Sequence, residues 1–110
     1  MVAEKPQRMV QVDLGRNKAT LDGTAVKFTP LEASLLAILA GYRGQIVARD
    51  TLKAGLWGTR QPKSADIELR GLVLRVRRKI RPCGFDIDNF QPGSYELIDD
   101  VLPPTEVTKA

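Results

Sequence analysis

Apolar and polar residues alternate near the N-terminus of the chain. Residues 9–14 (Met-Val-Gln-Val-Asp-Leu) repeat with a period of two, which is the period of a strand with one buried face. Residues 19–22 and 24–28 continue this pattern. The Asp22-Gly23 pair between them is typical of a tight hairpin, because glycine tolerates a positive φ. We therefore expect three short strands at the start of the chain.

A capping box begins the first helix. In Thr29-Pro30-Leu31-Glu32, the Thr hydroxyl can accept from the amide of Glu32, while the Glu carboxylate can accept from the amide of Thr29. Four apolar residues then share one helical face, namely Leu31, Leu35, Ile38 and Leu39. The pattern predicts a helix that ends near Gly41.

Two more helices and a hairpin are expected further along. Ser64 is a candidate N-cap, and Pro82 ends the helix that follows it. Pro92-Gly93 indicates a turn between two alternating stretches. In order, the expected elements are a short extended link at residues 45–47, a short helix from Arg49 to Leu56, a third helix from Ser64 to about Arg81, and strands at residues 85–90 and 94–98.

This order of elements predicts the fold class. Strands at both ends and three helices between them indicate an α+β protein whose N-terminal strands form an antiparallel sheet. A length of 110 residues suits one domain, which we place at residues 8–98. Residues 1–7 are expected to form a flexible arm, and residues 99–110 a flexible acidic tail.

Composition argues against an enzyme. The chain has no histidine and a single cysteine, Cys83, which excludes an intrachain disulfide and a His- or Cys-based zinc site. Arg residues near Cys83 suggest a reactive thiol, but without a His partner we interpret Cys83 as structural. We expect no cofactor, no metal and no membrane association, because the apolar stretch 31–40 is too short to span a bilayer. A cytoplasmic location is expected.

Positive charge is concentrated in the middle of the chain. Residues 49–81 carry ten Lys or Arg against three Asp or Glu, whereas residues 82–110 carry one against six. The net charge of the whole chain is only +4. This distribution favours a surface that binds a polyanion.

The third helix separates apolar from basic residues. On a helical wheel with about 100° per residue, an apolar stripe for the core is formed by Leu69, Leu72, Val73, Val76 and Ile80. A basic stripe on another side is formed by Lys63, Arg70, Arg77, Arg78 and Arg81, and Arg75 and Lys79 extend it. No acidic residue lies between Arg70 and Arg81, so we expect an unneutralised basic face.

Two apolar residues, Ile67 and Leu74, interrupt the basic stripe. In a major groove they could contact thymine methyl groups while neighbouring Arg side chains contact guanine or phosphates. Equally, they could pack against a loop or a second copy of the chain. The sequence leaves both interpretations open.

Taken together, these segments resemble the winged helix-turn-helix effector domain of OmpR/PhoB-type bacterial response regulators. The ordered matches cover roughly residues 9–98. They are Thr29-Pro30-Leu31-Glu32 with Leu35-Leu36, Gly44-Gln-Ile-Val47, Arg49 with Leu52 and Leu56-Trp57-Gly58, Ser64-Ala-Asp66, Arg75-Val-Arg-Arg-Lys-Ile80 and Tyr95-Glu-Leu97. We expect no receiver domain within these residues, which form either one domain of a longer protein or a regulator that acts alone.

The resemblance implies a four-stranded N-terminal sheet, a three-helix core and a C-terminal hairpin wing. It implies that the third helix enters the major groove and that the wing, with Gln91, reaches the minor groove. It further implies a phosphate contact for Arg49 and a largely buried Trp57. It also implies that the loop 58–63 contacts RNA polymerase and that two copies of the protein bind DNA as a pair.

We therefore expect sequence-specific binding of double-stranded DNA for transcriptional regulation, near the nucleoid. The candidate DNA-binding residues are Arg49, Lys63, Arg70, Leu74, Arg75, Arg77, Arg78, Arg81 and Gln91. The alternative is a winged helix that docks on RNA polymerase or another transcription factor, which the exposed Ile67 and Leu74 would favour.

Overall fold

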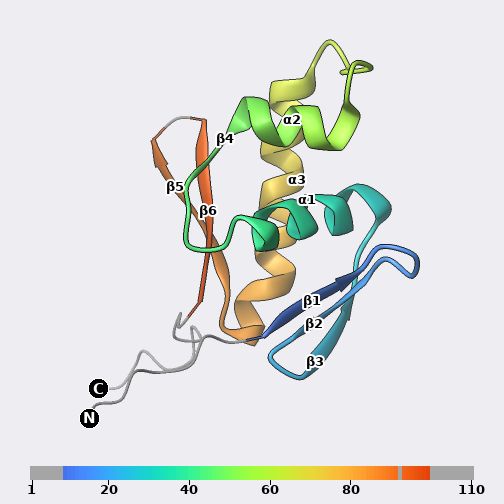
Figure 1. The fold of residues 1–110 in the computed structure, drawn as a ribbon, viewed down its shortest axis with the longest axis vertical. Helices are drawn as coiled ribbons and strands as arrows, with labels where there is room; N and C mark the ends of the chain where they lie inside the picture. Colours follow the sequence, from blue (N-terminus) through green and yellow to red (C-terminus); the bar gives the residue numbers. More distant parts are fainter. Residues whose placement is uncertain (1–8, 92, 100–110) are drawn as a thin grey trace.

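The computed structural model describes residues 9–91 and 93–99, with the side chains of residues 90 and 91 outside the description. It begins with three short antiparallel strands in the order β1-β2-β3 (Figure 1). They are β1 (Val10–Asp13), β2 (Lys18–Leu21) and β3 (Thr24–Lys27). The expected antiparallel sheet is confirmed, but within the described part of the chain it has three strands and not four. The expected arm and most of the expected tail lie outside the described residues.

Three helices follow this sheet. They are α1 (Pro30–Gly41), α2 (Arg49–Trp57) and α3 (Ala65–Ile80), and α3 continues into a 3₁₀ turn at Arg81–Cys83. The capping box of α1 is confirmed, because Glu32 N donates to Thr29 Oγ1 at 3.3 Å and Thr29 N donates to Glu32 Oε1 at 3.0 Å. Ser64 precedes α3 as expected but does not cap it; its hydroxyl donates to Glu68 instead.

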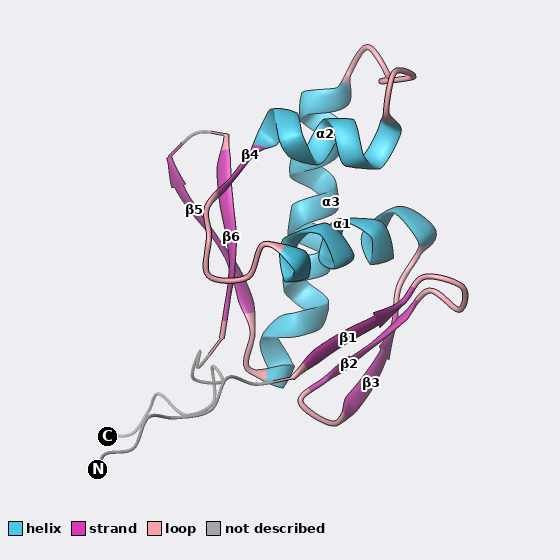
Figure 2. Ribbon diagram, in the orientation of Figure 1, coloured by secondary structure: helices cyan, strands magenta, loops and turns pink. Residues whose placement is uncertain are grey.

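A second sheet forms the wing. Strands β5 (Asp86–Gln91) and β6 (Ser94–Ile98) make the expected hairpin, and the short strand β4 (Val47–Ala48) adds to its other side in the order β4-β6-β5. Gly93 in the hairpin turn has a φ of +83°, which favours glycine. The helices lie between the two sheets, and the wing stands beside α3 (Figure 2). The predicted α+β winged-helix fold is confirmed.

The core lies where α1, α3 and the wing meet. All five residues of the predicted apolar stripe of α3 are buried, and Phe85 beyond them is fully buried. On α1, Leu35 and Leu39 are buried as expected, but Leu31 is 37% exposed. Leu31 therefore shares the predicted face without being part of the core. Helix α1 contacts β1, α2 and α3 on different sides, so its buried face includes Ala33 and Leu36 and does not follow one stripe.

Candidate nucleic-acid interface

Helix α3 turns one side away from the core. We call this side the outward face and define it as Ile67, Arg70, Leu74, Arg78 and Arg81, all of which are exposed. Its two apolar members are 68% exposed for Ile67 and 46% exposed for Leu74. The face lies opposite the buried stripe because residues that are three, four, seven or eight positions apart stack on one side of a helix.

The cations on one flank of the outward face are neutralised by a carboxylate of the wing. Arg77 donates to Asp86 from Nε at 2.8 Å and from Nη2 at 3.4 Å, and Arg81 Nε lies 3.7 Å from Oδ2 of the same carboxylate. The hydrogen bonds to Asp86 raise the pKa of Arg77, against the opposite effect of partial burial. Arg77 therefore ties α3 to β5 as well as facing the groove between them.

The other flank is neutralised by a buried carboxylate. Glu32 of α1 is 2% exposed and accepts from Lys79 Nζ at 2.7 Å and from Arg75 Nε at 3.3 Å. Burial raises the pKa of Glu32, but the hydrogen bonds from Lys79 and Thr29 and the charge of Lys79 outweigh it, and the pKa lies below its usual value. Arg75 and Lys79 therefore fix α3 on α1.

The expectation of an unneutralised basic face is thus wrong for four of its cations. Arg75, Arg77, Lys79 and Arg81 each have a carboxylate partner from outside α3. Those partners come from α1 and β5, so a helical wheel of α3 alone cannot show them. Two cations of the outward face, Arg70 and Arg78, make no ion pair with any residue in the described ranges.

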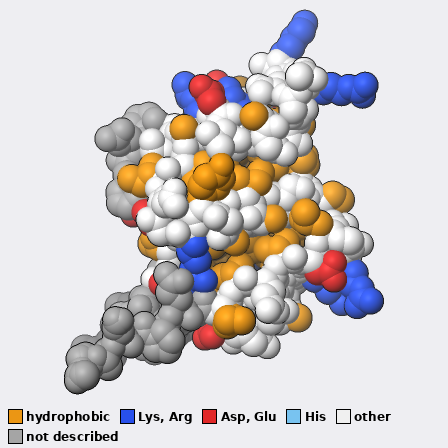
Figure 3. All heavy atoms as spheres, viewed as in Figure 1, with side chains coloured by type: hydrophobic (Ala, Val, Ile, Leu, Met, Phe, Trp, Pro, Cys, Tyr) orange, Lys and Arg blue, Asp and Glu red, His pale blue; other side chains and the backbone are white. Residues whose placement is uncertain are grey.

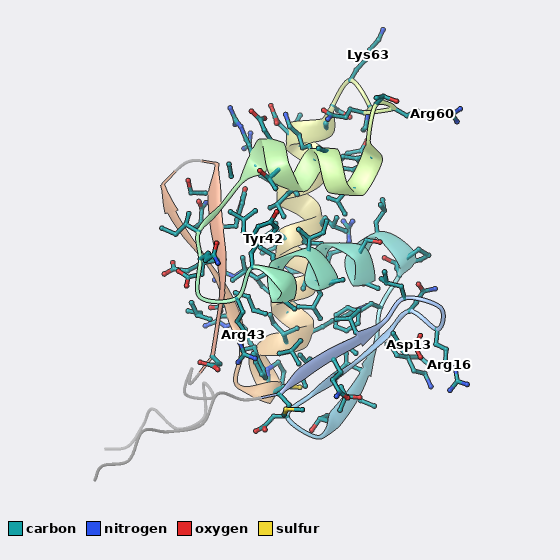
Figure 4. The ribbon with its side chains drawn as sticks, viewed as in Figure 1. Asp13, Arg16, Tyr42, Arg43, Arg60 and Lys63 are labelled. Carbon is teal, nitrogen blue, oxygen red and sulfur yellow. The ribbon has the colours of Figure 1, made fainter. Side chains whose placement is uncertain are left out.

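Lys63 lies apart from the outward face. Helix α3 begins only at Ala65, and Lys63 sits in the turn before it, where Ala65 N donates to Pro62 O at 3.1 Å. The placement of Lys63 on the wheel assumed two more helical residues and is wrong. Its side chain extends away from the body of the protein, as does that of Arg60 in the same loop (Figure 4).

A shallow groove of about 190 Å³ separates α3 from the wing. Its walls include Arg70, Leu74 and Arg77 from the helix and Ile87, Asn89 and Tyr95 from the wing. The three wing residues were missed by the sequence interpretation. The alternation of residues 85–90 places Ile87 and Asn89 on one side of their strand, and that signal could have identified them.

Arg49 lies beside the turn of the wing. Its backbone N donates to Gly93 O at 2.8 Å, and a Cβ added to Gly93 would lie 3.2 Å from Arg49 Cδ. The structure therefore brings Arg49 next to the wing turn. The backbone of Gln91 ends β5 at this turn, while its side chain lies outside the described part of the chain.

A second hollow, of about 440 Å³, lies on the opposite flank of α3. It is lined by the apolar or small residues Leu31, Trp57, Ile67, Gly71 and Leu72 and by the charged residues Glu68 and Arg75. Trp57 is partly exposed there and packs against the core, in agreement with the largely buried position that the resemblance implies. On the face seen in Figure 3, apolar side chains gather across the middle and most cations lie at the margins.

The described residues offer little for metal or thiol chemistry. No group of three or more His, Cys, Asp or Glu in the described part of the chain is placed to hold a metal ion. Burial raises the pKa of the Cys83 thiol, which opposes the activation by Arg considered from the sequence. None of the described helices combines the length and the hydrophobicity needed to cross a bilayer.

Comparison with known proteins identifies the family. Residues 23–95 match the family described as "Transcriptional regulatory protein, C terminal". The chain is 39% identical over 72 residues to the DNA-binding response regulator MtrA of Mycobacterium tuberculosis, covering 64% of this chain and 31% of MtrA. It is 30% identical over 89 residues to the transcriptional regulatory protein MoaR1 of the same species, covering 77% and 29%. The match thus spans less than a third of the length of either relative.

Solved structures agree with this assignment. The C-terminal domain of the nisin resistance regulator NsrR superposes with a TM-score of 0.69 at 25% identity, covering 86% of this chain and 96% of that one. The DNA-binding domain of CpxR from E. coli shares the fold, with a TM-score of 0.65 at 24% identity and coverage of 84% and 92%. The fold, the arrangement of α3 beside the wing and these matches lead to one conclusion. The chain belongs to the family of C-terminal domains of transcriptional regulatory proteins, which are winged helix-turn-helix DNA-binding domains of the OmpR/PhoB type.

Proposed function

We propose that the chain binds specific sequences of double-stranded DNA to regulate transcription, with α3 in the major groove and the wing at the neighbouring minor groove. The outward face of α3 is the observation that carries this proposal. It combines exposed Arg70 and Arg78, which have no ion-pair partner among the described residues, with a helix of 16 residues that nothing in the described fold covers on this side.

The width of an α-helix suits insertion of α3 into the major groove. A helix with its side chains is about 10–12 Å across, and the major groove of B-DNA is about 12 Å wide. Arg is suited to this position because its planar guanidinium can donate two parallel hydrogen bonds to guanine or to a phosphate. In this proposal Arg49, beside the wing turn, contacts a phosphate.

The ion pairs on the two flanks support the proposal in a second way. The bonds from Arg77 to β5 and from Arg75 and Lys79 to Glu32 hold α3 between the wing and α1. A helix held in this way keeps the backbone positions of Arg70 and Arg78 fixed relative to the wing, which lowers the entropy lost on binding. In this account Arg75 and Arg77 act mainly in positioning, and Arg81 and Lys63 add long-range attraction.

Selection of bound duplexes from a random pool, at physiological salt, tests the proposal. We expect one enriched sequence, whose repeats and spacing would also show whether two copies bind together. If Arg49, Arg70 and Arg78 each neutralise a phosphate, raising salt from 50 to 200 mM should weaken binding about 40-fold, because each contact contributes a slope of about 0.9. No enrichment, together with no binding at 50 mM salt, would refute the proposal.

A second candidate function is docking on RNA polymerase. The hollow beside Trp57 favours it, because exposed Leu31 and Ile67 form an apolar surface next to the loop that precedes α3. Purified polymerase, free of DNA, is the probe. Binding that survives Arg70→Ala/Arg78→Ala and is lost in Ile67→Asp would establish this function. Equal binding by the Ile67→Asp variant would exclude the hollow as the docking surface.

A further inference from the structure

Leu74 occupies an unusual place on the outward face. It lies at the centre of α3, one turn from Arg70 on one side and one turn from Arg78 on the other, and 46% of it is exposed. It also lines the groove between α3 and the wing. An apolar side chain is thus set between two cations that make no ion pair with a described residue, on the face of α3 that the proposed function turns towards the bases.

The chemistry of the major groove limits what Leu74 can recognise. The base edges there present hydrogen-bond donors and acceptors, and the one apolar group is the 5-methyl of thymine. A leucine side chain can neither donate nor accept. Placing it against the amino group of cytosine or adenine would remove water from a polar atom without replacing its hydrogen bond. Against a thymine methyl, it would remove apolar surface from water on both partners.

We propose that Leu74 contacts the 5-methyl group of a thymine and thereby determines the base at that position of the bound sequence. This inference rests on the proposed DNA-binding function. The two neighbouring Arg side chains reach beyond the leucine on both sides, towards phosphates or guanine acceptors. The outward face would therefore recognise a thymine with hydrogen-bond acceptors on either side of it.

Ile67 provides a matched comparison. It is the other apolar residue of the outward face and is more exposed than Leu74, at 68%. However, it lies in the first turn of α3 and lines the hollow beside Trp57 on the opposite flank from the wing. A general effect of exposed apolar side chains on binding would involve both residues. Thymine recognition through the groove beside the wing would involve Leu74 alone.

Replacing thymidine by deoxyuridine, one position at a time in the selected duplex, removes only the methyl group. We expect one such replacement for each bound copy of the chain to raise the Kd of wild type about fourfold, which corresponds to the burial of one methyl. The same replacement should leave the Kd of Leu74→Ala unchanged and should still raise that of Ile67→Ala about fourfold.

The outcomes separate this inference from the proposed function. If wild type binds the selected duplex but no deoxyuridine replacement changes its Kd, the thymine contact is refuted and DNA binding stands. A fourfold effect that persists in Leu74→Ala also refutes the contact. If no duplex is selected and none is bound, both proposals fail.

Discussion

Replacement of Glu32 by alanine should lower the free energy of unfolding by about 2–3 kcal/mol, the largest stability effect that we expect from a single polar residue. The variant loses three hydrogen bonds at once, from Thr29 N, Lys79 Nζ and Arg75 Nε. It also leaves a space at a position that is 2% exposed. This decrease in stability is smaller than the one expected when a fully buried ion pair is broken. The Lys79 and Arg75 side chains are 36% and 57% exposed, so they can turn to water.

Thermal or urea denaturation measures this effect. A loss of this size corresponds to a decrease in Tm of about 10 °C or more for a chain of this length. Glu68→Ala is the matched control, since it removes an exposed glutamate of α3 that accepts a hydrogen bond from the Ser64 hydroxyl, and it should cost less than about 1 kcal/mol. Similar losses in the two variants would show that Glu32 does not anchor α3.

The pH dependence of stability tests the charge of Glu32 separately. Its pKa in the folded protein lies below the usual value of 4.5, so its carboxylate contributes stability above that pH. That contribution is lost as the pH falls from about 4.5 towards the lower folded value. Glu32→Gln keeps the shape but has no proton to bind, so wild type should lose more stability than this variant between pH 5 and pH 3. Parallel curves for the two proteins would contradict the ionised state of Glu32.

The parts of the fold that depend only on residues close together in the sequence could be predicted from it. The capping box at Thr29, the alternation in the strands and the apolar stripe of α3 are local signals, and the structure confirms each of them. The expected start of α3 directly after Ser64 is confirmed, whereas the helical wheel wrongly included Lys63, which lies in the turn before the helix. The addition of β4 to the wing was not foreseen, because it depends on a strand almost fifty residues away.

The charge on the candidate site depends on tertiary packing and was predicted only in part. Exposure of Arg70, Leu74 and Arg78 followed from helical spacing alone. The partners of Arg77 and Arg75 did not, because Asp86 and Glu32 lie 9 and 43 residues away and meet α3 only after the wing and α1 have packed on it. For Glu32 the sequence indicates only the capping role. Its second role, holding α3, follows from its burial in the folded protein.

Loss of both Arg70 and Arg78 should have the largest effect on DNA affinity. Each side chain that contacts a base or phosphate is worth about 1–3 kcal/mol, so Arg70→Ala/Arg78→Ala should weaken binding of the selected duplex by about 30-fold or more. The fold should be retained, because both side chains are exposed and make no ion pair within the described part of the chain. The slope of log Kd against log salt should also fall, by about 0.9 for each lost phosphate contact.

A variant with the same loss of charge elsewhere gives the necessary control. Arg16→Ala/Lys18→Ala also removes two exposed cations, but from the N-terminal sheet, whose first strand packs on α1. Arg16 lies in the loop that joins β1 and β2, beside Asp13 (Figure 4). If net charge alone governed binding, the two double variants would be weakened equally.

The affinity of wild type and the two double variants for the selected duplex, measured side by side at physiological salt, is the most direct test of the role of α3. Binding through the outward face predicts a loss of about 30-fold or more for Arg70→Ala/Arg78→Ala and less than about threefold for Arg16→Ala/Lys18→Ala. Equal losses in the two variants, or a larger loss from the N-terminal sheet, would contradict DNA binding through this face.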